Sequence, residues 1–416
     1  MGKYSLILIL GFSIVVLGLI PLIHGRASRS YENYIDYYES SQARNIAISG
    51  ANFAANMLFQ NSSASISYSN IQMGEGSFSI STTIQPDSTI LLTSSGKFHR
   101  KNHTVEVLFG PSSFAKFGVY LATMGSIYWT TGDTVRGPSH VENILNVYGT
   151  PVFFGKVTTL NGTNPSILPN GPTNPKFYGG YQSGISVSMP PNLNNLQMAA
   201  SSGGKIFTPP ASPIGTYELY FKFNSNGTVS YKEYKGSIQL FDTTVGINQL
   251  APNGVILVSG GNIKVEGTVN GKVTLCATSG SVSGTGKIYI KGNILYNDNP
   301  IDNPSSDDFL GLVAEKDVVI PLPDGFPGTT CPTNIDIYAC VFSRTGKFYA
   351  ELDYKMGKLG NVNFYGSMSS YTIGAFSAGS PSYGYSNNFH FDRRLLIETP
   401  PYYPKTNILE ILSWKE

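Results

Sequence analysis

The sequence predicts a mainly β protein with one long N-terminal α-helix, the first half transmembrane and the second half amphipathic. Three observations predict this class. Residues 4–23 form an uncharged apolar run. The segment after that run has helical spacing and contains no proline between Pro21 and Pro86. The chain as a whole has 45 glycines, 25 prolines and only 13% charged residues, against about a quarter in an ordinary soluble protein. This composition is typical of a β-rich exported protein.

The apolar run has the length of a membrane anchor. A helix of about 20 apolar residues crosses the ~30 Å hydrocarbon core of a bilayer. A cleaved secretory signal is the alternative, but its apolar part is usually only about 7–15 residues, followed by small residues, whereas HGRASRS follows here. The charges flanking the run, Lys3 against Arg26 and Arg29, leave the orientation open. The residues that we expect to contact lipid or partner helices are Leu6, Ile7, Leu8, Ile14, Val15, Leu17, Ile20, Tyr31, Tyr34, Ile35 and Tyr38.

The helix is expected to continue beyond the membrane as far as about residue 61. Four bulky residues fall at offsets 0, 3, 4 and 7, which places them on one helical face: Tyr31, Tyr34, Ile35 and Tyr38. Ile46, Phe53 and Met57 extend an apolar face through the Ala-rich run that follows. We therefore predict that residues 1–61 form one helix, which meets lipid with its first half and protein with its second.

A single N-terminal helix of this kind resembles the type IV pilin-like subunits. In that family the apolar half keeps the subunit in the membrane and later packs in the core of a filament. Pilins usually carry a short basic leader that ends in Gly, then Phe and, a few residues on, Glu. Here Gly2 precedes Lys3, Gly11-Phe12 lies inside the apolar run, and the first acidic residue is Glu32. The pattern is closer to the minor pilins of the PilX kind, some of which also lack that Glu.

Two β regions follow the helix. Residues 62–115 are expected to form an antiparallel meander on the helix, with strands at 77–84, 88–98 and 103–110 and a turn at Pro86-Asp87. Residues 116–250 are a Gly/Pro-rich β region with long loops. That region contains one short helix within 189–207 and a hairpin whose turn is Asn226-Gly227.

Residues 251–416 are predicted to be a β-solenoid-like domain. Strands of three to five residues alternate with turns rich in Gly, Asn and Ser. An all-antiparallel, sandwich-like domain is the alternative, although sandwich strands are commonly longer. The apolar strand positions are Val255, Ile263, Val265, Val269, Val273, Leu275, Val282, Ile288, Ile290 and Ile294.

Several segments resemble an uncharacterised family of bacterial envelope proteins, known as a domain of unknown function and found on chains with a PilX-like N-terminus. They include APNGVILVSGGNIKVEGTVNGKVTL, SSDDFLGLVAEKDVVI, FDRRLL and the terminal ILSWKE. RGPSHVENILNVYGTPVFFGKVTT is also similar, although the family more usually has His-Thr-Asn at this point. The resemblance covers most of the chain and implies an envelope location, but it supplies no activity.

The sequence offers few residues for chemistry. A loop rich in acidic and amide residues has the oxygen ligands that calcium prefers, and its weak candidates are Asp298, Asp302, Asp307 and Asp308. Solvated turns of this composition are far commoner than calcium sites. His140 and Asn143 are more simply explained as turn-stabilising residues than as catalytic ones. Asp392 is expected to pair with the neighbouring Arg393 and Arg394.

The remaining candidates are weaker still. Cys331 and Cys340 could form a disulfide, with Cys276 left over. The five histidines are scattered, and the chain contains no GxSxG, HExxH or phosphate-binding loop. We therefore expect neither a catalytic residue nor a cofactor.

These features together predict a non-enzymatic, single-pass protein of the bacterial inner membrane with a periplasmic or extracellular ectodomain. It would be a minor-pilin-like structural or assembly subunit of a type IV pilus or a related secretion system. Its expected partners are the lipid bilayer and other pilin-like or envelope subunits, which bind through the N-terminal helix. A net charge of +2 gives no electrostatic case for nucleic acid. Cell-surface adhesion or glycan binding is the alternative function, and an envelope polysaccharide hydrolase or lyase is the third.

Overall fold

The computed structural model describes residues 2–61, 65–85, 89–167, 171–379 and 381–416. The expected turn Pro86-Asp87 lies outside the described residues. The chain divides into two compact units, one made of Met1–Pro111 with Ile408–Glu416 and the other of Ser112–Asn407. One long helix and a mostly β remainder confirm the predicted fold class. Residues 408–416, expected to be part of the C-terminal domain, belong to the first unit.

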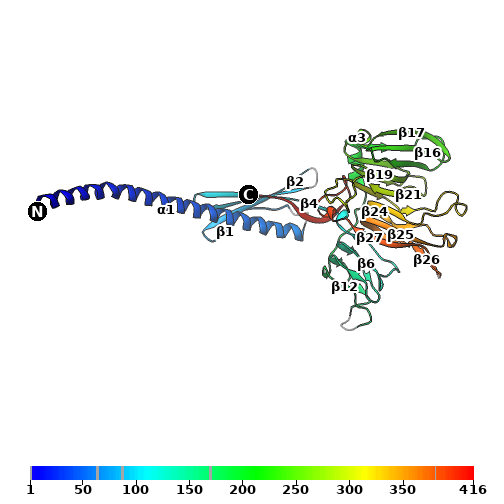
Figure 1. Ribbon diagram of the computed structural model, residues 1–416, viewed down its shortest axis with the longest axis horizontal. Coiled ribbons are helices and arrows are strands. Elements are labelled where there is room, and N and C mark those ends of the chain that lie inside the picture. The colour runs from blue at the N-terminus through cyan, green and yellow to red at the C-terminus, as the bar shows by residue number, and fades with distance from the viewer. Residues whose placement is uncertain (1, 62–64, 86–88, 168–170, 380) are drawn as a thin grey trace. The chain divides into compact units, whose positions relative to one another are not determined.

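The first unit begins with α1 (Gly2–Gln60), which is continuous through Pro21 (Figure 1). Only the C-terminal third of this helix has a buried face, made largely of small residues: Ala43, Ile46, Ala47, Gly50, Ala51, Ala54, Ala55 and Leu58. Of the predicted packing face, Ile46 is buried, and Phe53 is 46% exposed but its ring still contacts Tyr68 and Phe78 of the sheet. The alanines form the buried face because small side chains allow the sheet to approach the helix backbone closely.

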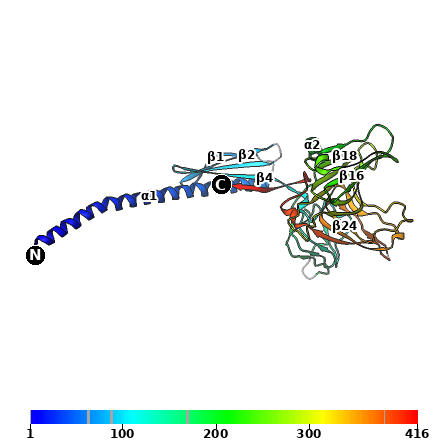
Figure 2. The ribbon, with the colours of Figure 1, turned by 45° about the horizontal axis from the view of Figure 1, so that its top comes forward.

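The second half of α1 lies along an antiparallel sheet, as Figures 1 and 2 both show. The strand order is β1 (Ser67–Met73), β2 (Gly76–Ile84), β3 (Ile90–Phe98), β4 (Lys101–Ser113) and β28 (Lys405–Lys415). β2, β3 and β4 correspond to the three expected strands of the meander, and β1, which was not predicted, adds a fourth; each strand is antiparallel to the next. Alternate residues of β3 are buried against the helix, the pattern of a sheet with one covered face.

Small residues on both sides make this contact close. A Cβ at Gly96 would lie 2.4 Å from both the Ala43 carbonyl oxygen and the Ala47 amide nitrogen. Next to it, the hydroxyl of Ser94 donates a buried hydrogen bond of 2.7 Å to the Ala47 carbonyl. Ion pairs at the margin join Asp36 of the helix to Lys101, and Arg44 to Glu416.

The second unit is built from parallel ladders. The first ladder contains, in spatial order, β14 (Lys205–Phe207), β18 (Val255–Ser259), β20 (Lys272–Thr278), β22 (Phe309–Ala314), β24 (Ile335–Ala350), β25 (Lys358–Ile373), β5 (Val119–Leu121), β7 (Ser139–Val141), β10 (Val157–Thr159) and β13 (Tyr181–Ser183). The second ladder contains β15 (Tyr217–Phe223), β19 (Asn262–Val269), β21 (Ile288–Tyr296), β23 (Val318–Ile320), parts of β24 and β25, and β27 (Tyr383–Phe391).

Shorter elements complete the unit. β6 (Thr134–Val135), β9 (Val152–Phe153) and β12 (Lys176–Phe177) form one small parallel sheet, and β8 (Leu145–Asn146) pairs with β11 (Thr163–Asn164). β16 (Thr228–Lys235) and β17 (Ile238–Gly246) extend β15 with antiparallel pairings, and β26 (Ser377–Ala378) pairs with β27 in the same way. The helical segments are α2 (Asn194–Ser201), α3 (Ile247–Leu250) and the 3-10 turns η1 (Phe114–Lys116), η2 (Tyr354–Met356) and η3 (Arg393–Leu396).

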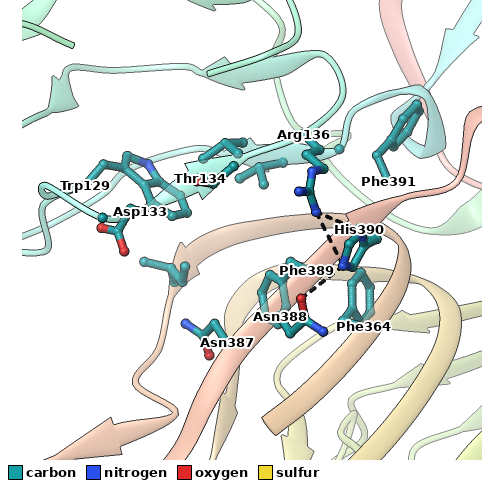
Figure 3. A pocket seen from close by; sticks show the side chains of 15 residues that line it. Trp129, Asp133, Thr134, Arg136, Phe364, Asn387, Asn388, Phe389, His390 and Phe391 are labelled. Carbon is teal, nitrogen blue, oxygen red and sulfur yellow. Dashed lines mark hydrogen bonds between the residues drawn. The ribbon is translucent and has the colours of Figure 1, made fainter. Parts of the chain in front are cut away.

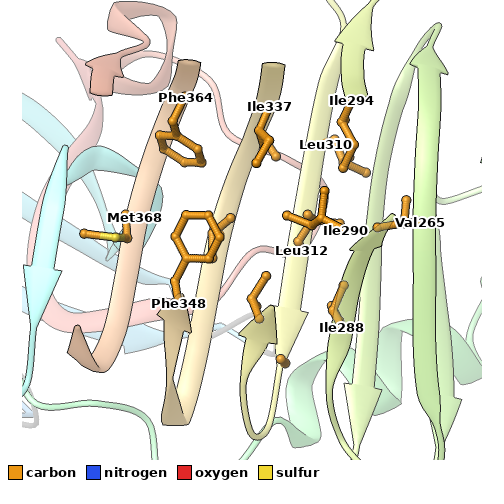
Figure 4. Packing of buried hydrophobic residues seen from close by; sticks show 14 of the residues in the cluster. Val265, Ile288, Ile290, Ile294, Leu310, Leu312, Ile337, Phe348, Phe364 and Met368 are labelled. Carbon is orange, nitrogen blue, oxygen red and sulfur yellow. The ribbon is translucent and has the colours of Figure 1, made fainter. Parts of the chain in front are cut away.

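The pairing between residues 255 and 296 is the arrangement that stacked coils give. β18 pairs with β20, and β19 with β21, in parallel. A sandwich would instead pair each of these strands with an antiparallel neighbour, so the sandwich alternative is wrong for this segment. Inward side chains of successive coils form one continuous core (Figure 4), including Val265, Ile290, Leu312, Ile337, Phe348 and Phe364.

The coils do not stack in chain order. The last coil, at Met368–Ser370 of β25, pairs with β5, which belongs to the first coil. Residues 119–183 therefore extend the stack beyond its C-terminal strands, and the chain returns through α2 to the opposite end. Residues 184–204, between β13 and β14, are called here the return segment. This segment covers the outer face of the first ladder together with η1 and the residues around Leu395 and Tyr403. They form a second core with outward residues such as Val255, Val313 and Phe342.

Candidate functional site

The apolar half of α1 has no partner within its own unit. Among the described residues between 2 and 42, none is buried. The predicted contact residues are mostly open: Leu6 (69%), Ile7 (67%), Leu8 (75%), Ile14 (63%), Val15 (58%), Leu17 (67%) and Ile20 (55%). By length and composition, α1 is a helix that could cross a membrane.

The tyrosines after the apolar run are also exposed. Tyr31, Tyr34 and Tyr38 are 67%, 66% and 48% exposed, and Ile35 is half-buried. Tyr37, which the spacing did not select, is 73% exposed. Tyr38 makes an edge contact with Phe98, with ring centroids 6.0 Å apart. Contact with the sheet therefore begins only near residues 36–39, and the aromatic residues before Tyr38 remain available to other molecules.

Three of the four calcium candidates accept hydrogen bonds. Asp308 is buried and accepts the backbone amides of Gly271 and Asp298. The side-chain amide of Asn303 donates to Asp298, and that of Asn299 donates to Asp302. Asp307 is exposed. No group of three or more His, Cys, Asp or Glu side chains among the described residues is placed to hold a metal ion. Calcium binding by this loop stays a prediction.

All three cysteines are free thiols in the structure. Cys276 and Cys340 face the second core, whereas Cys331 is half-buried in a loop. Burial raises the pKa of Cys340 to about 12. The suggested disulfide between Cys331 and Cys340 is therefore not present, because Cys340 packs with apolar residues on a central strand.

His140 is packed in the interior of the second unit. The ring is completely buried and stacks on Tyr120 with a centroid separation of 5.4 Å. Its Nδ1 lies 2.8 Å from the Thr158 hydroxyl, and its Nε2 lies 2.9 Å from a carboxylate oxygen of Glu142. Burial lowers the pKa of His140, while Glu142 opposes that change.

The neighbours of His140 fasten the return segment. Glu142 also accepts hydrogen bonds from the Ser186 hydroxyl and the Val187 amide, and the Tyr120 hydroxyl donates to the Val187 carbonyl. Asn143 accepts a hydrogen bond from the side chain of Asn161 on the next coil. This network holds the return segment against the first ladder.

A second histidine lies beside a hollow of about 290 Å³ (Figure 3). Nη1 of Arg136 lies 2.9 Å from Nδ1 of His390, and Nε2 of His390 lies 3.0 Å from Oδ1 of the Asn388 side chain. The neutral tautomer with its proton on Nε2 satisfies both contacts, because Arg136 can only donate. Burial and the positive charge of Arg136 lower the pKa of His390. Scattered histidines in the sequence gave no signal for this pair.

On the other side of the pair is a larger hollow of about 630 Å³, called here the arginine hollow. Three arginines line it, together with aromatic and proline side chains: Arg136, Arg393, Arg394, Phe154, Tyr365, Pro300 and Pro304.

The three arginines of the hollow differ in their partners. Arg394 is engaged, since it pairs with Asp392, donates 2.7 Å to the Ser306 carbonyl and lies over the Phe309 ring. Arg136 and Arg393 are exposed and have no carboxylate partner among the residues that the structure describes. The expected pairing of Asp392 therefore involves Arg394 and not Arg393.

Comparison with solved structures finds the competence-associated pilin ComZ from Thermus thermophilus, at 13% identity and a TM-score of 0.38. The alignment covers 91% of this chain and 97% of that chain. No family model and no curated protein matches the chain. The resemblance to PilX-like proteins and to the uncharacterised envelope family stays a prediction.

Proposed function

We propose that this chain is a membrane-anchored, pilin-like structural subunit of the bacterial envelope. The apolar half of α1 would reside in the inner membrane and, on assembly, pack against the corresponding helices of neighbouring subunits. The proposed setting is a type IV pilus or a related secretion system, with the β units outside the cytoplasm. The observation that carries the proposal is the exposed apolar run 4–23, in a helix that has no buried residue from 2 to 42 and continues without a break into a part docked on a sheet.

The energetics favour a helix with two environments. Leaving one large apolar side chain in water rather than burying it costs roughly 1.5–3 kcal/mol. The exposed run contains many such residues, including Leu6, Ile7, Leu8, Ile14 and Leu17. Lipid tails or the apolar helices of other subunits would each remove this surface from water. The same residues could therefore serve membrane residence first and subunit packing afterwards.

The aromatic residues extend the proposed contact surface. At 1.5 Å rise per residue, Tyr31 lies on the order of 12 Å beyond Ile23, which ends the apolar run. The headgroup layer is only about 5–8 Å thick on each side of the hydrocarbon core, so Tyr31 lies beyond it, and Tyr34 and Tyr37 lie roughly 17 and 21 Å beyond Ile23. These rings are therefore outside the bilayer, where a neighbouring subunit could reach them. In an assembly, they would contact the docked half of a neighbouring helix.

A non-enzymatic role is part of the proposal. Displaced pKa values often mark catalytic groups, and here the largest displacements belong to buried tyrosines and cysteines. Burial raises the pKa of Tyr120, Tyr217 and Tyr296. The hydroxyl of Tyr217 donates to Glu233, and that of Tyr296 accepts the Leu310 amide. Both hydrogen bonds join residues of different strands and therefore stabilise the fold.

The decisive experiment follows the native protein through cell fractionation. The mature N-terminal sequence would be determined on protein from membranes, from culture supernatant and from sheared surface filaments. A subunit of the proposed kind would be found in the inner membrane and, in assembling cells, also in the filament fraction with α1 retained. Recovery only as free protein that lacks residues 4–23 would contradict the proposal, because a removed signal sequence could not pack in an assembly.

A further inference from the structure

We propose that the arginine hollow binds an acidic polysaccharide, with Arg136 and Arg393 contacting a sugar carboxylate and Phe154 packing on a sugar ring. This proposal goes beyond the subunit role, since it assigns a ligand to the β ectodomain. It concerns only residues of the second unit.

The charges around the hollow favour a carboxylate ligand. Arg136 is held through one nitrogen by the imidazole of His390, which is neutral when it accepts this hydrogen bond. Its remaining N–H groups have no acidic partner among the described side chains, and the same is true of Arg393. Asp392 is already neutralised by Arg394. A planar guanidinium donates two parallel hydrogen bonds to a carboxylate, which is why two unpaired arginines at one hollow indicate an anionic group.

Two acids of the loop beside the hollow accept hydrogen bonds within that loop. Pro300 and Pro304 line it from the loop that contains Asp298 and Asp302. Both carboxylates accept side-chain amides of that loop, from Asn303 and Asn299. Asp133 lines the first hollow and accepts hydrogen bonds from the backbone and hydroxyl of Thr130.

Aromatic rings continue the site along the stack. Strands β6, β9 and β12 pair in register at Val135, Phe153 and Phe177. The next residues, Arg136, Phe154 and Tyr178, are therefore aligned on successive coils, about 4.8 Å apart, and are called here the corner column. The rings of Phe154 and Tyr178 stack with centroids 5.5 Å apart, and both are exposed, at 52% and 70%. Flat apolar surface beside a guanidinium fits a sugar acid better than a free anion.

Glycines fix the corner column in place. Gly137, Gly155 and Gly179 follow its three residues directly. A Cβ at Gly155 would lie 1.9 Å from the Gly137 carbonyl oxygen, and one at Gly179 would lie 2.2 Å from the Gly155 carbonyl carbon. Gly137 has φ +80°, and a Cβ there would meet the Phe391 ring. Only bare backbone allows the coils to meet this closely, so the arginine and the two rings are held on a rigid corner.

The size of the hollow suits one or two sugar units. Its volume of about 630 Å³ lies within the range of small-molecule sites, roughly 300–1,000 Å³. The open corner column would allow a longer chain to continue along the coils. A linear polysaccharide is therefore a better match than an isolated small acid.

The test uses the full chain in detergent micelles and measures binding to sodium polygalacturonate by calorimetry. Methyl-esterified polygalacturonate, poly-glutamate and inorganic phosphate are the comparison probes. We expect binding to polygalacturonate that weakens with salt. Arg136→Gln and Arg393→Gln should each weaken it tenfold or more, and Phe154→Ser should weaken it severalfold. Lys358→Gln, which removes an exposed charge outside the hollow, should leave it unchanged.

Four outcomes would overturn the proposal. They are no binding of polygalacturonate by the wild-type chain at low salt, equal binding of the methyl ester, equal binding of poly-glutamate, and full competition by phosphate at the concentration that galacturonate itself requires. Circular dichroism of each variant separates a lost contact from lost folding. If Arg136→Gln unfolds, Arg393→Gln decides the result, because η3 is held by Asp392 and Arg394 and does not depend on Arg393.

Discussion

At the scale of single residues, small side chains decide where this protein can pack. Gly96 and Ser94 face the alanines of α1, and the column of Gly137, Gly155 and Gly179 allows three coils to meet at one corner. In each place backbone lies against backbone, so even a methyl group has no space. These positions are therefore more sensitive than many larger core residues, whose neighbours can adjust.

Gly96→Ala tests the helix–sheet contact. The new Cβ would lie 2.4 Å from backbone atoms of Ala43 and Ala47, and a helix backbone cannot yield locally. We expect a loss of about 1–3 kcal/mol in the stability of the first unit, measured by thermal unfolding of the full chain in detergent. Gly25→Ala is the matched control, since that Cβ would have no neighbour within 4 Å and alanine favours helix. Equal effects of the two substitutions would contradict the close contact.

His390 predicts a pH effect on stability. Its pKa in the folded protein is lowered by burial and by Arg136, whereas the unfolded value is about 6.5. Below about pH 6.5 the unfolded chain therefore binds more protons than the folded one. The stabilising contribution is complete above about pH 6.5 and is lost as the pH falls through the lowered pKa.

The measurement is the melting temperature between pH 7 and pH 5. We expect the wild-type chain to lose stability over this range and His390→Gln to lose less of it, because the amide does not protonate. His140, whose pKa is also lowered, accounts for part of the remaining slope. An unchanged slope in His390→Gln would show that this imidazole does not control the effect.

At the scale of elements, the two parts of α1 have different surroundings. Its docked third has a buried face of alanines, while residues 2–42 have no buried side chain. Tyr31 and Tyr34, which the spacing assigns to the membrane and assembly face, are exposed, and the face that packs on the sheet is made largely of alanines. Apolar periodicity identifies a face that seeks contact, but it does not say whether the partner is the same chain.

Leu17→Lys tests the proposed anchor. A lysine near the centre of a membrane helix costs about 2.5–3.5 kcal/mol on insertion scales, so we expect a clear fall in the membrane-bound fraction after carbonate extraction. Tyr37→Lys, on the same helix beyond the apolar run, should leave membrane retention unchanged. If both variants are retained like the wild type, the apolar half is not the element that holds the chain in the bilayer.

At the scale of the second unit, the order of coils in space differs from their order in the chain. The first coil in sequence, at β5, pairs with the last coil, at β25. Met368 lies fully buried at this junction and contributes to the continuous core. The coils that contain β5 and β25 are therefore expected to stabilise one another, although they are far apart in the sequence.

Met368→Ala tests this stacking order. Removing a buried side chain of this size costs roughly 2–5 kcal/mol. Hydrogen exchange should accelerate in residues 119–159 as well as in 340–373, although the two segments are distant in sequence. Val229→Ala, in β16 at the opposite end of the stack, should instead accelerate exchange in residues 217–246. Protection of residues 119–159 that is unaffected by Met368→Ala would contradict the observed pairing.

Much of the fold could be predicted from local patterns. The continuous helix, the meander over residues 76–113 and the hairpin at Asn226-Gly227 all follow from periodicity and turn chemistry. The candidate site could not be predicted in the same way. Arg136 and His390 are separated by 254 positions, and neither lies in a motif of known chemistry. Their contact depends on β27 and the N-terminal coils meeting, a long-range event that leaves no local signal.

The sequence by itself determined the uncharged apolar run, the single long helix and the short strands with glycine turns, because these depend on interactions between neighbours in the chain. Only the tertiary structure decided which face of α1 is buried, that residues 408–416 complete the first unit, and that the coils stack out of chain order. Those choices depend on which surfaces fit together without a gap or a clash. How well two surfaces fit depends on the path of the folded backbone, and the residue types alone do not determine that path.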